Sequence, residues 1–304
     1  MDAENNLNNS KDSHENNDEN VIVISPGKMA LKRFLKNKLA IVGFVITAIL
    51  VIFVVFGPFF WDHEPNRTNV TITFTPPFTM PEHPLGTDEL GRDIMARLMA
   101  GGRVSLSIGL ASAVVAISFG TLVGALAGYY GKWVDSALMR LTDIFMTLPS
   151  LPLLIALGGV FSPSPVLLIF LISILFWMTT ARLVRSRFLT LRTLDYVMAA
   201  KAVGCKNRRI IFKYLLPNSL GPIIVTTALT VGRAIIMEST LSFLGVGLNP
   251  PTASWGNMLQ IARLNLIRMP SLAIIPGMLI LLTVLAINFL GDGLNDALDP
   301  KQSR

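Results

Sequence analysis

Residues 39–61 read LAIVGFVITAILVIFVVFGPFFW and contain no charged side chain. A helix that crosses a hydrocarbon core about 30 Å thick needs about 20 consecutive apolar residues. The apolar residues here follow one another without alternation and without a helical stripe, so no face is left polar for contact with water. This stretch therefore predicts a helix that spans a membrane.

The composition of the whole chain agrees with that prediction. Of its 304 residues, 52% are hydrophobic and 15% are charged, and the mean hydropathy is +0.57. Soluble domains are about 45–50% apolar and about 25% charged. A net charge of +7 is also found in nucleic-acid-binding proteins, but here the basic residues lie beside the apolar runs, as in membrane proteins. We expect an all-α polytopic membrane protein with the lipid bilayer, and no nucleic acid, as its partner.

Six apolar runs are long enough to predict about six transmembrane helices. They occupy residues 39–61, 104–129, 137–158, 165–181, 221–237 and 272–290. In the second run, Gly120, Gly124 and Gly128 fall on one helix face, where small residues let a neighbouring helix approach closely. We expect this stripe to pack inside the protein, and contact with a second chain or a pore is the alternative.

The distribution of Lys and Arg predicts the orientation. Five basic residues lie between positions 28 and 38, before the first run, and nine lie between positions 182 and 213, after the fourth. Cytoplasmic loops carry such an excess. With six spans, both termini then lie in the cytoplasm, and the segments 62–103 and 245–269 lie outside.

The chain divides into three predicted parts. Residues 1–27 are rich in Asn, Asp and Glu and predict a disordered acidic cytosolic tail, which lacks the features of a cleaved signal peptide. Residues 28–103 hold the first transmembrane helix and the external loop. Residues 104–304 form a core of five transmembrane helices with a cytosolic segment at 182–217. The single cysteine, Cys205, excludes an internal disulfide and a cysteine-cluster metal site.

The first external loop contains HPLGTDELGRD at residues 83–93. Thr87 or Asp88 is predicted to cap a short helix that reaches Met99, with acidic residues favoured in its first turn. The alternative is a metal or acid–base site, for which only proximity in the sequence argues. Its members would be His83, Asp88, Glu89 and Asp93. Because capping explains the acids, we expect no bound metal and no catalytic residue here.

The second external segment combines SFLGVG at 242–247, two prolines at 250–251 and SWG at 254–256. Glycines, prolines and a tryptophan at the end of a span predict an irregular, partly re-entrant stretch with Trp255 as an interfacial anchor. Lining the outer mouth of a pathway is an equally compatible interpretation.

Two ionisable residues, Arg233 and Glu238, lie in or beside the fifth run. A charge at mid-depth costs about 2.5–3.5 kcal/mol on insertion scales, so each needs a partner. Five residues apart, they point in different directions on a helix and cannot pair with each other. We keep two hypotheses, structural pairing with another helix or subunit and lining of a transport pathway, and Arg233 has the further option of snorkelling to the end of the span.

The cytosolic segment ends in a pattern typical of a basic amphipathic helix at a membrane surface. The basic face consists of residues at i, i+3 and i+7, which are Lys206, Arg209 and Lys213. The opposite, apolar face consists of Ile210, Ile211, Tyr214 and Leu215. Gly204 is predicted to break the helix upstream and Pro217 to end it. The expected geometry is helix, glycine turn, helix and return to the bilayer, with a lipid-bound surface helix as the simpler alternative.

Four motifs in this order carry a resemblance to a known family. They are Met198, Ala199, Ala200 and Gly204 with Leu216 and Pro217; LGTDELGRD at 85–93 with Gly86, Thr87, Asp88, Gly91, Arg92 and Asp93; residues 238–247 with 250–256; and residues 289–300. The chain, from about residue 28 to its end, resembles the permeases of binding-protein-dependent ABC importers, in particular the C-type permeases of the peptide and nickel branch. The resemblance implies the type I ABC importer permease fold in a bacterial cell membrane.

The resemblance also implies partners. These are a homologous B-type permease, two ABC ATPases that bind ATP and Mg, an external substrate-binding protein or lipoprotein, and a dipeptide or oligopeptide substrate. The segment around 198–217 would dock onto an ATPase, with Lys206, Arg209 and Lys213 on one face. The chain departs from the family at two positions: Met198 stands where the family usually has Glu, and Tyr214 stands where it often has His or Ile. Without the Glu, a Glu-specific salt bridge to the ATPase is not expected, and docking would depend on shape.

Other functions find less support in the sequence. No nucleotide-binding loop of the GxxxxGK[ST] type is present, so energy must come from a partner and this chain is expected to hold no cofactor and no ATPase site. An intramembrane enzyme lacks its motifs, and all three histidines lie outside the predicted spans. An ATP-independent carrier or channel is the remaining alternative from another class, and nickel or glutathione are the alternative cargoes.

Overall fold

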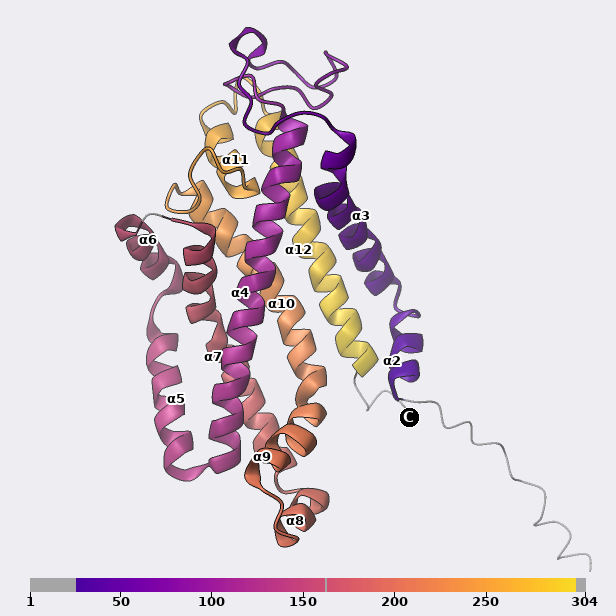
Figure 1. Ribbon diagram of the computed structural model, residues 1–304, viewed down its shortest axis with the longest axis vertical. Helices are drawn as coiled ribbons and strands as arrows, with labels where there is room; N and C mark the ends of the chain where they lie inside the picture. The colour runs from indigo at the N-terminus through magenta and orange to yellow at the C-terminus, as the bar shows by residue number, and fades with distance from the viewer. Residues whose placement is uncertain (1–25, 162, 299–304) are drawn as a thin grey trace, which may run out of the picture.

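The structure is a computed structural model that describes residues 26–161 and 163–298, and these residues form helices and loops without a β-strand. Within the described part, five helices are long and apolar enough to cross a membrane. They are α3 (Lys38–Phe60), α4 (Ile94–Tyr130), α7 (Pro165–Leu191), the continuous helix Asn207–Phe243 that ends in α10 (Leu216–Phe243), and α12 (Ser271–Leu298). They run along the long axis of the molecule, with the loop 61–93 at one end and α8 (Asp195–Ala202) at the other (Figure 1).

The third predicted span, 137–158, is bent and not straight. It consists of α5 (Lys132–Thr147) and α6 (Ser150–Val160), which meet at 79°. Pro149 precedes α6, and the residue before it, Leu148, has the extended backbone that a following proline favours. The prediction of about six transmembrane helices is confirmed as five, or six if the bent pair is one span.

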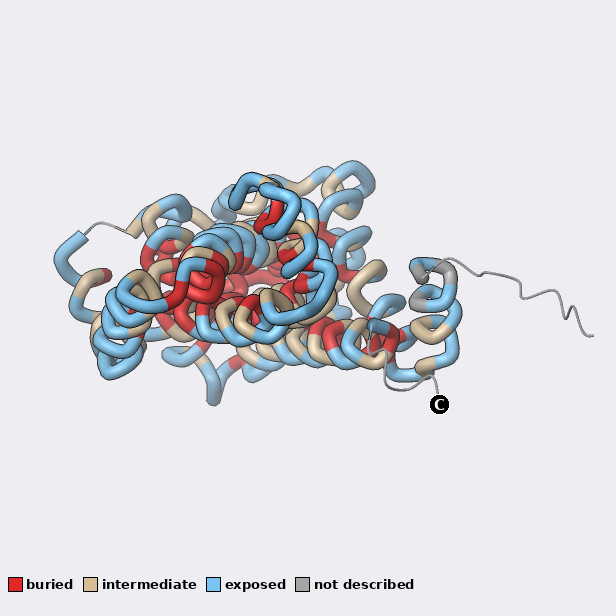
Figure 2. The backbone as a smooth tube through the Cα atoms, turned by 90° about the horizontal axis from the view of Figure 1, so that it is seen from below, coloured by how far each residue is buried: buried red, intermediate tan, exposed pale blue. Residues whose placement is uncertain are grey.

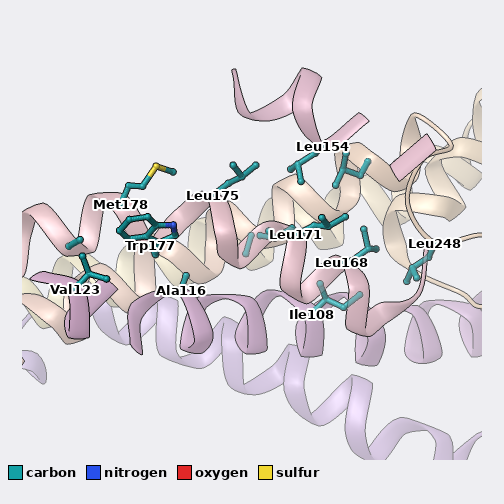
Figure 3. Close-up of a cluster of buried hydrophobic side chains, with 14 residues drawn as sticks. Ile108, Ala116, Val123, Leu154, Leu168, Leu171, Leu175, Trp177, Met178 and Leu248 are labelled. Carbon is teal, nitrogen blue, oxygen red and sulfur yellow. The ribbon is translucent and has the colours of Figure 1, made fainter. Parts of the chain in front are cut away.

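The centre of the molecule is the contact between α4 and α7. Buried residues gather along these helices, whereas exposed residues dominate the periphery (Figure 2). Side chains such as Ile108 and Ala116 of α4 meet Leu171 and Trp177 of α7 (Figure 3). The helices are close enough for apolar side chains from both to form one cluster.

The glycine stripe makes that close approach possible. A β-carbon on Gly120 or Gly124 would collide with a main-chain carbonyl of α7, and one on Gly128 would lie 2.6 Å from the β-carbon of Phe188. The expected internal packing of Gly120, Gly124 and Gly128 is therefore confirmed.

The first and last membrane-spanning helices of the described part, α3 and α12, also pack together. A β-carbon on Gly43 of α3 would lie 2.6 Å from the carbonyl oxygen of Ala286 in α12. At the cytosolic end predicted for both helices, the Asn37 amide donates to the Asp296 carboxylate at 2.9 Å. α3 is thus held by the last helix of the chain, although α4 follows it directly in sequence.

An arginine of α4 stabilises a proline-containing turn of α3. Pro58 has no N–H, so it cannot donate to the carbonyl of Val54 four residues earlier. Arg103 replaces that donor, since its Nε and Nη2 donate to the carbonyl oxygens of Val54 and Val55 at 2.8 Å each. An arginine near the end of a span therefore has a structural acceptor.

The N-terminal part differs from prediction in one detail that the structure describes. The predicted disordered tail lies outside the described residues except for Pro26 and Gly27, which begin the helix α2 (Pro26–Phe34). The remaining elements are the 3-10 turn η1 (Val70–Ile72), α9 (Asn207–Arg209), the π-helix η2 (Ile210–Leu215) and α11 (Trp255–Arg263).

Candidate functional site

The segment 182–217, predicted to lie in the cytosol, has the expected helix, turn and helix. α8 ends at Ala202, Gly204 adopts a φ of +79°, and α9 begins at Asn207. Glycine is the residue that adopts such a backbone most readily. Tyr129 at the end of α4 contacts both arms, since its hydroxyl donates to Asn207 Oδ1 at 2.7 Å and Lys201 Nζ lies 5.5 Å from its ring centre. The two arms are therefore held in a fixed relation to α4.

The prediction that Pro217 ends the second arm is wrong. The helix passes through η2, in which the N–H of Leu216 donates to the carbonyl of Ile211, and continues as α10. Pro217, which has no N–H to donate, directly follows the π-helix, and this widened turn lets the helix continue past it. One continuous helix, Asn207–Phe243, thus joins the cytosolic turn to the opposite end of the protein.

The amphipathic pattern is present, but its apolar face lies against protein. Ile210 and Leu215 are fully buried in a cluster with Phe188 of α7 and Val197 of α8, and Ile211 belongs to the same cluster. Lys206, Arg209 and Lys213 are exposed on the other side. The predicted arrangement on the membrane surface is wrong, because α4, α7 and α8 already cover the apolar face.

An apolar surface remains uncovered on the turn itself. Met198 is 51% exposed and Val203 is 85% exposed, and Leu194 and Tyr196 are each 41% exposed. Ala199 is exposed and Ala200 is partly buried. Gly204 has no atom within 4 Å of the position that a β-carbon would take. We call residues 193–204 the exposed turn.

The motif at 83–93, predicted to lie outside the cell, is a compact loop that its own acidic residues stabilise. Asp88 is buried, and its Oδ1 accepts from the N–H groups of Leu90 and Arg92 at 2.9 and 3.0 Å. Its Oδ2 pairs with Arg92 Nε at 2.7 Å. Gly86 and Gly91 have φ values of +81° and +67°, and a β-carbon on either would collide with a main-chain carbonyl, that of Thr75 or Asn69. Thr87 is fully buried in the same loop.

The cap of α4 is Asp93, so the prediction of a cap at Thr87 or Asp88 is wrong. Asp93 accepts from Ala96 N at 2.6 Å, from Trp61 Nε1 at 3.0 Å, and contacts His83 Nδ1 at 2.8 Å. Helix α4 consequently starts ten residues before the predicted run and continues through Met99. These contacts occupy the carboxylates of Asp88 and Asp93, and Glu89 accepts from the Asn265 amide at 3.2 Å. Among the described residues no group of three or more His, Cys, Asp or Glu is arranged to hold a metal ion.

Glu238 is a structural group in a buried network. It is fully buried, and it accepts from Ser105 Oγ of α4 and Ser242 Oγ of α10 at 2.9 Å each. Ser105 Oγ in turn accepts from the N–H of Trp255, the first residue of α11. Three helices thus meet at one carboxylate. The contact with Ser242 could have been predicted from the sequence, because Ser242 lies four residues after Glu238 on the same helix. Ser105 is too distant along the chain for its contact to be inferred.

Trp255 is not the interfacial anchor that the sequence predicted. It is fully buried, its Nε1 donates to the carbonyl of Leu98 at 2.9 Å, and its ring lies against Gly102. The segment after α10 therefore folds back onto α4 as part of the protein core.

Arg233 differs from Glu238. It is exposed on α10, and within residues 26–161 and 163–298 it forms neither an ion pair nor a hydrogen bond. The structure separates the two charges that the sequence grouped, one inside the protein and one on its surface.

Comparison with known proteins agrees with this architecture. Residues 120–304 match the family described as "binding-protein-dependent transport system inner membrane component". The chain belongs to this family of inner membrane components. Residues 25–77 also match the "N-terminal TM domain of oligopeptide transport permease C". The resemblance seen in the four motifs is confirmed.

Curated relatives of this inner membrane component cover it almost end to end. It is 42% identical over 278 residues to the dipeptide transport system permease protein DppC of Alkalihalophilus pseudofirmus, covering 91% of each chain. It is 39% identical to the oligopeptide transport system permease protein OppC of Bacillus subtilis, covering 91% of this chain and 90% of the relative. A putative peptide permease of Brucella suis is 39% identical over 92% of this chain and 93% of its own length.

Proposed function

We propose that the chain is a membrane-spanning permease subunit of an ATP-driven importer that moves dipeptides or oligopeptides into the cell. The observation that carries this proposal is the end-to-end similarity to relatives named as dipeptide and oligopeptide permeases. No nucleotide-binding loop occurs in the sequence, so ATP and Mg are bound by partner ATPases. The other partners are a B-type permease and an external substrate-binding protein.

The exposed turn is proposed to be the docking element for an ATPase. Met198, Val203 and Leu194 offer apolar side chains to a partner, and Lys206, Arg209 and Lys213 border them with positive charge. Large exposed apolar surfaces of this kind mark interaction sites. Met198 makes the centre of the surface apolar, so we expect its recognition to depend on shape and burial more than on an ion pair.

This assignment fixes the orientation. If the exposed turn faces the cytosol, the N- and C-termini lie on the same side and the loop 61–93 lies outside, in the cell membrane of a bacterium. The Lys and Arg bias of the sequence supports the same orientation.

Gly204 offers a direct test of docking. A β-branched residue at a φ of +79° strains the backbone, whereas asparagine adopts this region more readily, and space for either side chain is present. We expect Gly204→Val to insert and assemble but to lose ATP-dependent peptide uptake, and Gly204→Asn to keep most of it. Uptake is measured in vesicles with the whole complex. Unchanged uptake by Gly204→Val would contradict docking through the turn.

The transport class is tested separately. Purified chain in liposomes should not move peptide unless the ATPases and the binding protein are present. Peptide uptake without them would favour a secondary carrier or channel. Uptake of nickel chelates or glutathione, and not of peptides, by the complete complex would favour the alternative cargoes.

A further inference from the structure

Arg233 is an arginine inside a membrane-spanning helix, and it has no partner among residues 26–161 and 163–298. It is exposed, and α10 is apolar for most of its length. A charged side chain facing lipid at mid-depth costs about 2.5–3.5 kcal/mol or more. A polar or negatively charged partner on the face of α10 that bears Arg233 would remove this cost.

The level of Arg233 lies within the membrane. Gly232, its neighbour, lies beside α12, where a β-carbon would be 3.6 Å from Asn288 Oδ1. On its other side, α12 at Ala286 lies against Gly43 in the uncharged run of α3. The outer end of α10, Phe243, is about 15 Å further along at 1.5 Å per residue. An arginine side chain cannot extend that far, so the predicted option of snorkelling to the outer end does not apply.

The same face of α10 carries further polar groups. Thr226, Arg233 and Thr240 are spaced by seven residues, so they follow one another along the helix with a drift of about 20° per step. The two threonines are partly exposed, and each donates to the carbonyl four residues earlier, at 2.8 Å. Because these donors are already used, the threonines do not compete for the ligand of Arg233, and the exposed Ile236 beside Arg233 is apolar.

We propose that Arg233 binds the C-terminal carboxylate of the peptide as it passes through the membrane. The inference rests on the proposed function. A guanidinium presents its donors in a planar fork that matches a carboxylate, and this pairing is stronger away from bulk water. Every unmodified peptide carries one such group whatever its side chains. A contact with that group suits a transporter of varied sequences.

The test compares two probes in the complete importer. Trialanine and trialanine amide differ only in the terminal carboxylate, and each is supplied at saturating occupancy of the binding protein in proteoliposomes. Hydrogen bonds to a charged group are worth about 1.5–3 kcal/mol, so Arg233→Gln should lower trialanine uptake about tenfold or more. Uptake of the amide should stay the same, and ATP hydrolysis stimulated by the loaded binding protein should persist.

Two further variants serve as controls for Arg233→Gln. Arg233→Lys keeps the charge but not the fork, so its loss with trialanine should be smaller than that of Arg233→Gln. Arg140→Gln removes another exposed arginine, on α5, and should change neither uptake rate.

Several outcomes would overturn the proposal. Equal loss for both probes would show that Arg233 acts without contacting the carboxylate. Failure of both Arg233 variants to assemble with the partner permease would show that Arg233 pairs with a residue of that subunit. Failure of the unmodified complex to take up either probe with ATP would instead reject the proposed function, so the two failures are distinguishable.

Discussion

At the scale of single residues, most charges near the membrane have a structural explanation that becomes visible only in three dimensions. Asp93 caps α4, Arg103 satisfies the carbonyls that Pro58 leaves free, and Glu238 joins three helices. Each of these side chains has a partner at least 30 residues away along the chain. Sequence spacing suggested capping for the acids of the loop, but it placed the cap at the wrong residue.

Glu238 permits a prediction at this scale. Glu238→Leu leaves the buried hydroxyls of Ser105 and Ser242 without their acceptor, and each such loss costs about 1–3 kcal/mol. Glu238→Gln keeps an acceptor of similar shape and should cost less. Thermal unfolding of the purified protein in detergent should therefore rank the wild type above Glu238→Gln and that variant well above Glu238→Leu. Equal midpoints for both variants would refute the network as a source of stability.

At the scale of elements, apolar run length predicted the existence of the spans better than their shape. The runs at 39–61, 165–181 and 272–290 lie within or nearly coincide with helices, whereas the third run bends at Pro149 and the second and fifth extend beyond their predicted ends. The fourth and sixth helices also continue past their runs, to Leu191 and Leu298. The extensions of the second and fifth runs follow from the cap Asp93 and the π-turn η2, which keep the backbone helical where hydropathy no longer indicates it. The π-turn lets Pro217 join a helix that its presence was predicted to end.

The α4–α7 contact yields a prediction for the element scale. A β-carbon on Gly124 would collide with α7, so Gly124→Ala should force the helices apart and cost about 1–3 kcal/mol. Gly159 in α6 has no atom within 4 Å of a β-carbon position, so Gly159→Ala should be neutral or stabilising. The yield of folded protein and the midpoint of thermal unfolding should be measured for both variants. A Gly124→Ala protein as stable as Gly159→Ala would show that the close approach is dispensable.

At the scale of the whole molecule, one helix connects the exposed turn with the network around Glu238. No break interrupts Asn207–Phe243, and its two ends are each fastened to α4, at Tyr129 and at Ser105. Under the proposed function, a displacement of the turn by an ATPase would reach the opposite face through this helix, to the extent that the helix stays rigid across Pro222. The sequence indicated both ends of this connection but suggested a break between them, at Pro217.

That rigidity is open to a direct test. Leu220 and Ile224 are exposed on α10, 44% and 43%, so replacing both with glycine softens the helix without opening a cavity in the core, at about 1 kcal/mol per residue. We expect ATP hydrolysis to continue while less peptide is moved per ATP. The double alanine variant, which removes the same side chains but keeps the helix stiff, should transport normally. If the alanine variant loses as much transport as the glycine variant, the side chains and not the stiffness matter.

The pairing of α3 with α12 has a consequence for how the chain is made. Asp93 contacts Trp61, His83 and Ala96, which are all close to it in sequence. This end of the α3–α4 hairpin can therefore form while synthesis continues. Gly43 and Asn37 of the same hairpin contact Ala286 and Asp296, and the last pair is 259 residues apart along the chain. Contacts between such distant parts of a chain form late. During synthesis, α3 therefore lacks its α12 contacts until α12 has been made.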